Sequence, residues 1–308
     1  MKTKLLLLLT ILSYSARAQQ TDKAIARVRY TFTHIQDTTQ RDKPYTENML
    51  LITGKNASLY TSYDKMKRSK AMKLQIQEQI RNQAGGPTNI RIENRETGPV
   101  SNIDYFSFAS DGKLIVKERV VNDYLIEEEL PKIDWKISKD TASFSGLLCQ
   151  KATASFKGRS WIAWFAPDLP LSSGPWKLNG LPGLIVEAHD SNKEVYFQFA
   201  GLEKVTAAPQ TDAVNGEVTA SGTTVRILGI DTEDYSGNEI KVPSKAIRTT
   251  RKELDKLKSA FEKDPEGFMT AQMAAQGIKG SFKMNRTPGS GIERRQRVVN
   301  NPIERAAK

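Results

Sequence analysis

The strongest constraint on this chain is a series of short alternating segments joined by brief polar turns. Residues 24–34 place Ala26, Val28, Tyr30, Phe32 and His34 on one side and mostly polar residues on the other, which is the two-residue period of a β-strand. Similar paired segments follow along the chain: 47–53 with 57–63, 103–109 with 114–121, 151–156 with 161–165, and 184–189 with 195–199, with 224–228 as a later candidate. Turns this short join antiparallel neighbours. The sequence therefore predicts an antiparallel meander, not a parallel α/β sheet.

Helical patterns are few and lie in two places. Residues 64–83 repeat apolar side chains at Met72, Ile76 and Ile80 and stop at a Gly-Gly-Pro breaker. Thr250 followed by Glu253 forms a capping-box pattern, and Pro265 opens a second helical segment that stops at Gly277. The predicted fold is mainly β (α+β): a large curved antiparallel sheet or half-barrel, with one early helix and a C-terminal helical pair.

The first residues have the layout of a secretory signal peptide. A basic start is followed by the apolar run Leu5–Leu12, interrupted by Thr10, and by Ala16-Arg17-Ala18 with small residues at the cleavage positions. The apolar run is shorter than the roughly 20 residues that span a bilayer, and we expect no transmembrane span elsewhere. We predict a signal peptide over residues 1–18, cleavage near Ala18, and a protein in the periplasm or secreted.

Charge and cysteine content narrow the functional classes. The formal net charge is +11, but most of the excess lies in the signal peptide and after residue 278, so the body carries no basic face that predicts nucleic-acid binding. We expect residues 19–278 to form a single β-rich domain and residues 279–308 a basic flexible tail, with possible weak contact to anionic envelope surfaces. Cys149 is the only cysteine, which excludes an intrachain disulfide.

The segment from residue 161 to residue 190 is the densest signal in the chain. It holds three of the four tryptophans and two Pro/Gly turns. Such a segment either packs over one end of a sheet or forms a ligand platform, and packing is the expected first role. If it binds, the candidate residues are Trp161, Trp164, Trp176, Gly180, Leu181, Pro182 and Gly183. At the second turn we expect Pro182 to fix φ and Gly183 to take a positive φ.

The hexapeptide Gly180-Leu181-Pro182-Gly183-Leu184-Ile185 resembles the motif that names the GLPGLI family of exported proteins, found mainly in Bacteroidetes. The surrounding segments Cys149–Ala152, Trp161–Phe165 and Gly174–Lys177 also resemble that family, as do Tyr30–His34 and Glu47–Met49. The resemblance extends to about Phe199. It implies an exported bacterial protein without an established activity, and it supplies no catalytic residues.

Catalysis and metal binding have little support in the residues. Cys149, His189 and an acid could form a nucleophilic set, but a lone cysteine that opens a strand is more often a small buried residue. His34 lies on an apolar strand face, where a packed, hydrogen-bonded histidine is expected. Cys149, His34, His189 and methionines could hold a soft ion, yet no pair has ligand spacing. We predict no cofactor and assign no metal ligand.

The sequence thus favours an exported binding or chaperone-like protein. A curved antiparallel sheet presents a concave apolar face that suits an apolar ligand or an envelope protein as partner. The alternatives are a cell-envelope hydrolase that uses Cys149 and His189, and a soft-metal-binding protein.

Overall fold

The computed structural model describes most of the chain, with gaps at both ends and between several internal segments. The described residues are 21–82, 98–206, 217–220, 223–226, 235, 237–275, 277 and 298–306. The predicted signal peptide and most of the predicted tail therefore lie outside the described residues.

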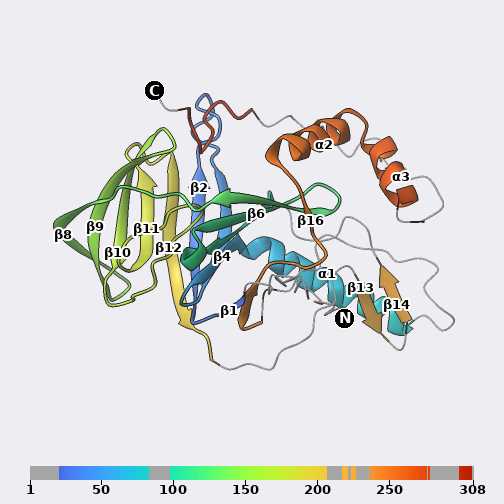
Figure 1. Ribbon diagram of the computed structural model, residues 1–308, viewed down its shortest axis with the longest axis horizontal. Helices are drawn as coiled ribbons and strands as arrows, with labels where there is room; N and C mark the ends of the chain where they lie inside the picture. Colours follow the sequence, from blue (N-terminus) through green and yellow to red (C-terminus); the bar gives the residue numbers. More distant parts are fainter. Residues whose placement is uncertain are drawn as a thin grey trace, which may run out of the picture.

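The body of the protein is one 12-stranded sheet built from two meanders. The first meander contains β2 (Ala26–His34), β3 (Tyr45–Thr53), β4 (Ala57–Ser62), β5 (Ile103–Phe108), β6 (Lys113–Arg119) and β7 (Asp123–Glu129). The second contains β8 (Lys136–Phe144), β9 (Leu147–Phe156), β10 (Arg159–Ala166), β11 (Leu184–Asp190) and β12 (Val195–Lys204). The antiparallel pair β2 and β12 joins the two meanders. The sheet curves strongly, so that β9–β12 stand upright in Figure 1 while β6 lies across the view.

Of the other described strands, one extends the large sheet and four form two separate two-stranded sheets. The short strand β16 (Ile247–Arg248) extends the large sheet beside β7 and pairs with it in parallel, an exception to the antiparallel pattern that the sequence predicts. β1 (Thr21–Lys23) pairs with β15 (Glu239–Lys241), and β13 (Glu217–Ala220) pairs with β14 (Thr223–Arg226). β16 can run in either direction beside β7, because more than 100 residues of chain separate the two strands.

The alternation of side chains predicted for the strands agrees with their burial in the structure. Ala26, Val28, Tyr30 and His34 are buried on one side of β2, while Arg29 on the other side is exposed. The turn between β9 and β10 has positive φ at both Lys157 and Gly158, the conformation that matches the twist of a tight hairpin. The predicted mainly β fold is confirmed.

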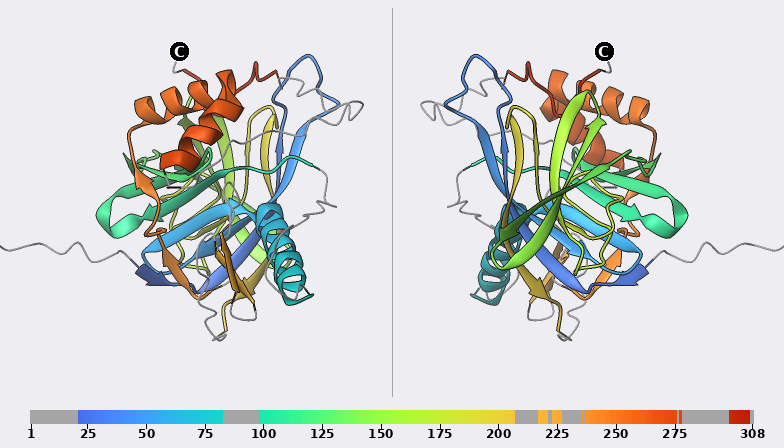
Figure 2. Two further views of the ribbon diagram at one scale, coloured as in Figure 1. Left: turned by 90° about the vertical axis from the view of Figure 1, so that its right-hand side faces the viewer. Right: turned by 90° about the vertical axis from the view of Figure 1, so that its left-hand side faces the viewer.

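The described residues contain three α-helices, one early and two near the C-terminus, as predicted. α1 spans Tyr63–Asn82 and buries Ile76 and Ile80. α2 spans Arg251–Lys263 and starts with the predicted capping box, in which Thr250 and Glu253 satisfy each other's backbone N–H groups. α3 spans Pro265–Ala275. Figure 2 shows α1 near one end of the sheet body and α2 with α3 near the other.

The largest apolar cluster lies on the inner, concave face of the sheet. Strands β2, β3 and β9–β12 contribute to it, and the loop of residues 167–183 crosses over it. This covering loop buries Trp176, Leu178 and Leu181 against Trp161 and the neighbouring strands. The segment richest in Pro, Gly and Trp is therefore part of the core, in agreement with the packing role expected for it.

The turn chemistry within the hexapeptide differs from the prediction. Gly180, not Gly183, takes the positive φ, at 88°. Gly183 is required for space: a Cβ there would lie 2.2 Å from the carbonyl oxygen of Ala166 and 2.8 Å from its carbonyl carbon. The expectation of a left-handed Gly183 is therefore wrong, because the constraint at this residue is the close approach of two backbones.

The prediction of a flexible C-terminal tail is wrong for residues 298–306. Asn301 is 2% exposed, its backbone N–H donates to Gln36, and its side-chain amide donates to the Ile35 carbonyl. Arg305 donates from its backbone to Lys157. We call residues 298–306 the C-terminal strap. The sequence pattern does not reveal it, because its two valines are exposed and the strap is held by polar bonds to residues far away in the chain.

The close approach at Gly183 leads to a stability prediction. Gly183→Ala should lower the urea midpoint by a free energy of about 1–3 kcal/mol, because the added methyl overlaps the Ala166 carbonyl and forces β10 and the loop apart. Pro182→Ala, at the neighbouring exposed residue, is the matched control and should change the midpoint little. Equal midpoints for Gly183→Ala and the parent protein would show that the two backbones can separate freely.

Candidate functional site

A cavity of about 340 Å³ opens on the concave face of the sheet. Its floor comes from five adjacent strands, β12, β2, β3, β4 and β5, and its cover comes from Trp176 of the loop and from the C-terminal strap. Six of its fourteen lining residues are aromatic: Phe32, Tyr45, Tyr60, Tyr105, Trp176 and Phe197. The volume is at the small end of the range for ligand sites.

The aromatic wall is a connected set of ring contacts. Phe32 stacks on Phe197 with ring centroids 5.0 Å apart, and Tyr60 meets Phe197 edge to face at 6.1 Å. Trp161 lies behind the wall, 5.7 Å from Trp176 and 6.1 Å from Phe197. These rings fix one another, because each is held between neighbours at favourable offset or edge geometries. The cavity is therefore a preformed feature of the sheet.

Glu47 is the carboxylate in this wall. It lies on the inner face of β3 and is 2% exposed. The Tyr45 hydroxyl donates to one carboxylate oxygen at 2.5 Å, and the Ser101 backbone N–H donates to the other at 2.8 Å. Among the described residues, Glu47 has no lysine, arginine or histidine in an ion pair. An ionised carboxylate accepts about four hydrogen bonds, so acceptor capacity remains on the cavity side.

Tyr60 is the second polar group in the cavity with unused hydrogen-bonding capacity. Its hydroxyl is buried and has no hydrogen-bond partner among the described residues. Burial raises its pKa well above the ordinary value, and the nearby Glu47 raises it further, so the phenol keeps its proton at neutral pH and can donate. A buried hydroxyl without a partner is costly, and it marks a point where a ligand could bond.

His34 closes one end of the cavity and behaves as the sequence predicts. Its Nε2 lies 2.8 Å from the Asn301 carbonyl oxygen, and a carbonyl only accepts, so Nε2 carries the proton. Burial lowers the pKa of His34, and the nearby Arg159 lowers it further, although the bond to Asn301 acts in the opposite direction. The ring is therefore neutral at pH 7 and adds no positive charge to the cavity.

Arg159 holds the strap in place behind His34. The buried guanidinium donates to the Asp190 carboxylate, to the Asn301 side chain and to the carbonyls of Pro302 and Ile303. Each of its bonds runs from β10 either to β11 or to the strap. A buried arginine must be paired in this way to be tolerated, so Arg159 makes the strap an integral part of the cavity wall.

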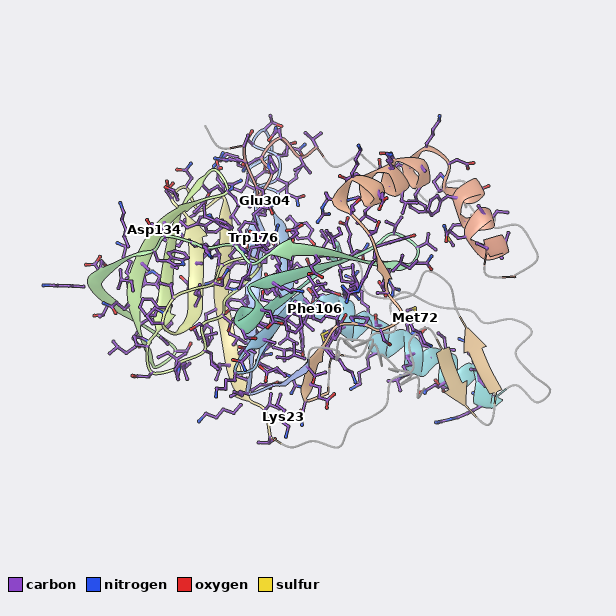
Figure 3. The ribbon with its side chains drawn as sticks, viewed as in Figure 1. Lys23, Met72, Phe106, Asp134, Trp176 and Glu304 are labelled. Carbon is purple, nitrogen blue, oxygen red and sulfur yellow. The ribbon has the colours of Figure 1, made fainter. Side chains whose placement is uncertain are left out.

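The loop side of the cover is held by charge and by an unusual backbone. Lys177 pairs with Glu304 of the strap at 2.8 Å, and Figure 3 labels Glu304 and Trp176 in this region. Trp176 has φ of 57°, a left-handed conformation that costs a bulky residue about 1–3 kcal/mol. The surrounding contacts to Trp161 and Phe156 hold its ring. The covering loop thus positions Trp176 at a measurable cost in stability.

Of the seven binding residues proposed from the sequence, only Trp176 lines this cavity. Trp161 and Leu181 belong to the core, and Gly183 is a packing position. Trp164 lies on the opposite face of β10 from Trp161. Its ring centroid is 5.8 Å from that of Phe144. Pro182 is exposed. Gly180 borders a separate, more polar cavity of about 260 Å³ beside residues 53–58 and 172–174.

Sequence reasoning missed Glu47, Tyr60, Ser101 and Tyr105. One signal was present: Glu47 has the same parity in its strand as Met49 and Leu51, which are buried. A charged residue on the inward side of a strand is unusual and points to a site. Nothing local places Ser101 or Tyr105 beside it, because both depend on the order of strands in the sheet.

The proposed pair Cys149 and His189 is not assembled. His189 pairs with Ile162 on β10, which pairs with Thr153 on β9, four residues from Cys149. The two side chains are therefore offset by two strands and by roughly 13 Å along the strand direction. His189 instead bonds to the Asp190 carbonyl and meets the Tyr196 ring edge to face. Cys149 is fully buried, as expected for a small core residue.

The thiol of Cys149 is also poorly suited to nucleophilic attack. Burial raises its pKa to about 11, and the nearby Glu187 contributes. Reactive cysteines have lowered pKa values and partial exposure. Among the described residues, no group of three or more His, Cys, Asp or Glu side chains is arranged to hold a metal ion.

Comparison with known families finds one short match. Residues 156–187 match the model of a family described as a protein of unknown function, Porph_ging. This stretch runs from the end of β9 into β11 and contains the hexapeptide Gly180–Ile185. No curated protein matches the chain.

Two solved structures are similar to the chain at low identity. They are structures of PNGF-II in the P21 and C2 space groups, each 15% identical with a TM-score of 0.41. The matches cover 62% and 60% of this chain and 29% of each PNGF-II chain. The chain therefore spans less than a third of the length of these proteins.

The raised pKa of Cys149 predicts slow labelling. In the native protein at pH 8, iodoacetamide should react with Cys149 on the order of 100-fold more slowly than with an ordinary thiol, because so little thiolate is present. Mass spectrometry after timed quenching measures the rate, and protein unfolded in urea provides the ordinary rate as control. Rapid native labelling with a midpoint near pH 7 would instead revive the hydrolase alternative.

Proposed function

We propose that this chain is an exported binding protein that holds a small, partly apolar ligand in the cavity on the concave face of the sheet. The observation that carries the proposal is a preformed aromatic cavity that contains two buried polar groups with unused bonding capacity, Glu47 and Tyr60. Apolar walls with a few well-placed polar groups are the usual composition of ligand sites. The short match to a family of unknown function is compatible with such a role and names no ligand.

A cavity of about 340 Å³ favours a small molecule over a client protein. The strap and Trp176 cover the apolar surface that a chaperone would have to present. A hydrolase that uses Cys149 and His189 has no geometric support, because the two side chains are separated and the thiol pKa is raised. We therefore retain ligand binding as the function and drop catalysis by this pair.

Filling the cavity should abolish binding. Ser101 lines the cavity and supports Glu47 through its backbone N–H, so Ser101→Phe adds a ring without removing that bond. Ser101→Ala is the matched control and leaves the cavity open. Thermal melting with four probes, choline, 3,3-dimethyl-1-butanol, 3,3-dimethylbutanoate and 2-phenylethanol, should show a rise of several degrees for at least one probe with the parent and Ser101→Ala, and none with Ser101→Phe.

Two outcomes would contradict ligand binding in this cavity. The first is that none of the four probes shifts the melting temperature of the parent protein at millimolar concentration. The second is a shift that survives in Ser101→Phe, which would place the binding elsewhere. Circular dichroism of both variants establishes that they are folded before the comparison is made.

Export is the second part of the proposal. It is supported by the basic, apolar and small-residue sequence of residues 1–18, and within the described part of the chain no helix is both long and apolar enough to cross a membrane. The resemblance to the GLPGLI family, whose members come mainly from Bacteroidetes, agrees with a periplasmic or secreted location. The proposal places the cavity outside the cytoplasm, where it would meet ligands of the envelope or medium.

Signal cleavage is tested directly on the expressed protein. N-terminal sequencing of the periplasmic or secreted form should begin at Gln19, because Ala16 and Ala18 supply the small residues that the peptidase requires. Ala18→Arg is the matched variant and should block processing. Protein that retains Met1 and remains in the cytoplasm would contradict the export proposal without affecting the cavity.

A further inference from the structure

We infer that the cavity selects a small organic ammonium ion, such as an alkylated or quaternary amine, held between the Glu47 carboxylate and the surrounding aromatic faces. The inference rests on the proposed function and adds the chemical class of the ligand. It is carried by the combination of one buried carboxylate that has no cationic partner among the described residues and a wall to which six aromatic residues contribute.

The lining of the cavity carries a negative charge that no cationic residue of the described structure neutralises. The Glu47 carboxylate accepts from Tyr45 and from the Ser101 backbone, and both donors are neutral. Among the described residues that line the cavity there is no lysine or arginine, and the one histidine, His34, is neutral at pH 7. A buried anion with only neutral donors is expensive. A cation that enters the cavity would supply the missing charge.

The aromatic rings of the wall favour a positively charged ligand. Aromatic faces carry negative charge at their centres and attract cations within about 6 Å, most strongly where water is excluded. Tyr45 bonds directly to Glu47, and Tyr60 lies close enough for the Glu47 charge to raise its pKa. The ring centroids of Phe32 and Tyr45 are 6.0 Å apart, and those of Tyr60 and Tyr105 are 6.4 Å apart. Tyr45 and Tyr60 thus both lie near the carboxylate, and each has a further aromatic ring beside it.

The Tyr60 hydroxyl offers the ligand a hydrogen-bond donor. The protonated Tyr60 hydroxyl has no partner among the described residues. It can donate to an oxygen on the ligand, while the ammonium group faces Glu47. The cavity therefore suits a molecule that carries a positive nitrogen and, a short distance away, a hydroxyl or carbonyl oxygen. Free amino alcohols and betaines have this chemistry, and so does a lysine side chain beside its peptide carbonyl.

The test compares two probes of equal shape and different charge. Choline and 3,3-dimethyl-1-butanol differ only in a quaternary nitrogen replaced by carbon. Isothermal titration calorimetry should give at least tenfold tighter binding of choline to the parent protein. Nα-acetyl-lysine methylamide in a parallel titration distinguishes the two sources of the cation: tighter binding than choline indicates a lysine side chain, and weaker binding indicates a free quaternary amine.

Two variants test the role of the carboxylate. Glu47→Gln keeps an acceptor for the Ser101 N–H and removes the charge, so choline should lose at least tenfold in affinity while 3,3-dimethyl-1-butanol is unchanged. Glu187→Gln is the matched control: Glu187 is also a buried carboxylate bonded to a tyrosine, Tyr196, but it does not line the cavity. It should leave both affinities unchanged.

The outcomes separate this inference from the proposed function. Equal affinity of the parent protein for choline and its neutral isostere would overturn cation selection, and so would undiminished choline binding by Glu47→Gln. Binding of the neutral or anionic probes alone, abolished in Ser101→Phe, would leave the binding protein intact and refute only the ammonium assignment. The charge comparison uses the parent protein, so it decides the question even if Glu47→Gln fails to fold.

Discussion

The buried guanidinium of Arg159 is the interaction on which the candidate site depends. It emerges from β10 and is satisfied by Asp190 on the adjacent strand and by three groups of the C-terminal strap. Removing its partners would leave an unpaired charge in the core, a change that typically costs about 3–5 kcal/mol. The strap is therefore held by an electrostatic requirement of the sheet. Once it is in place, the Asn301 carbonyl fixes the orientation of His34 and one side of the cavity is closed.

Curvature of the sheet explains why aromatic residues from distant segments meet. Tyr60 on β4 and Phe197 on β12 are separated in the sheet by β3 and β2, yet their rings lie 6.1 Å apart. A flat sheet would hold strands three positions apart at roughly 14 Å, so the contact requires the inward bend of this region together with long side chains. The same bend brings Tyr105, from the next strand, into the wall. Strand order and curvature, more than any local motif, produce the cavity.

Local patterns predicted the elements of this protein better than they predicted its site. Strand parity in residues 26–34, the helix of residues 63–82 and the Thr250 capping box all rest on interactions between residues close in sequence, so they could be read directly. The strap could not, since its stability comes from Arg159, more than 140 positions earlier in the chain. Glu47 gave a partial signal through its inward parity. Its isolation from any cation in the described structure depends on strand order, which spacing alone does not reveal.

The hexapeptide and the cavity are connected through the covering loop. Gly183 permits the close backbone contact with Ala166 that ends the loop, and Gly180 supplies the left-handed turn before it. Between these fixed points and β10, the loop holds Trp176 in a strained conformation whose ring completes the cavity wall. Lys177, the next residue, pairs with Glu304 of the strap. The motif therefore contributes to the site without lining it: its glycines set the path of the loop, and the loop places one aromatic ring and one cation where the strap can meet them. A glycine-rich motif can shape a cavity in this indirect way, because the backbone geometry that it allows determines where a distant side chain lies.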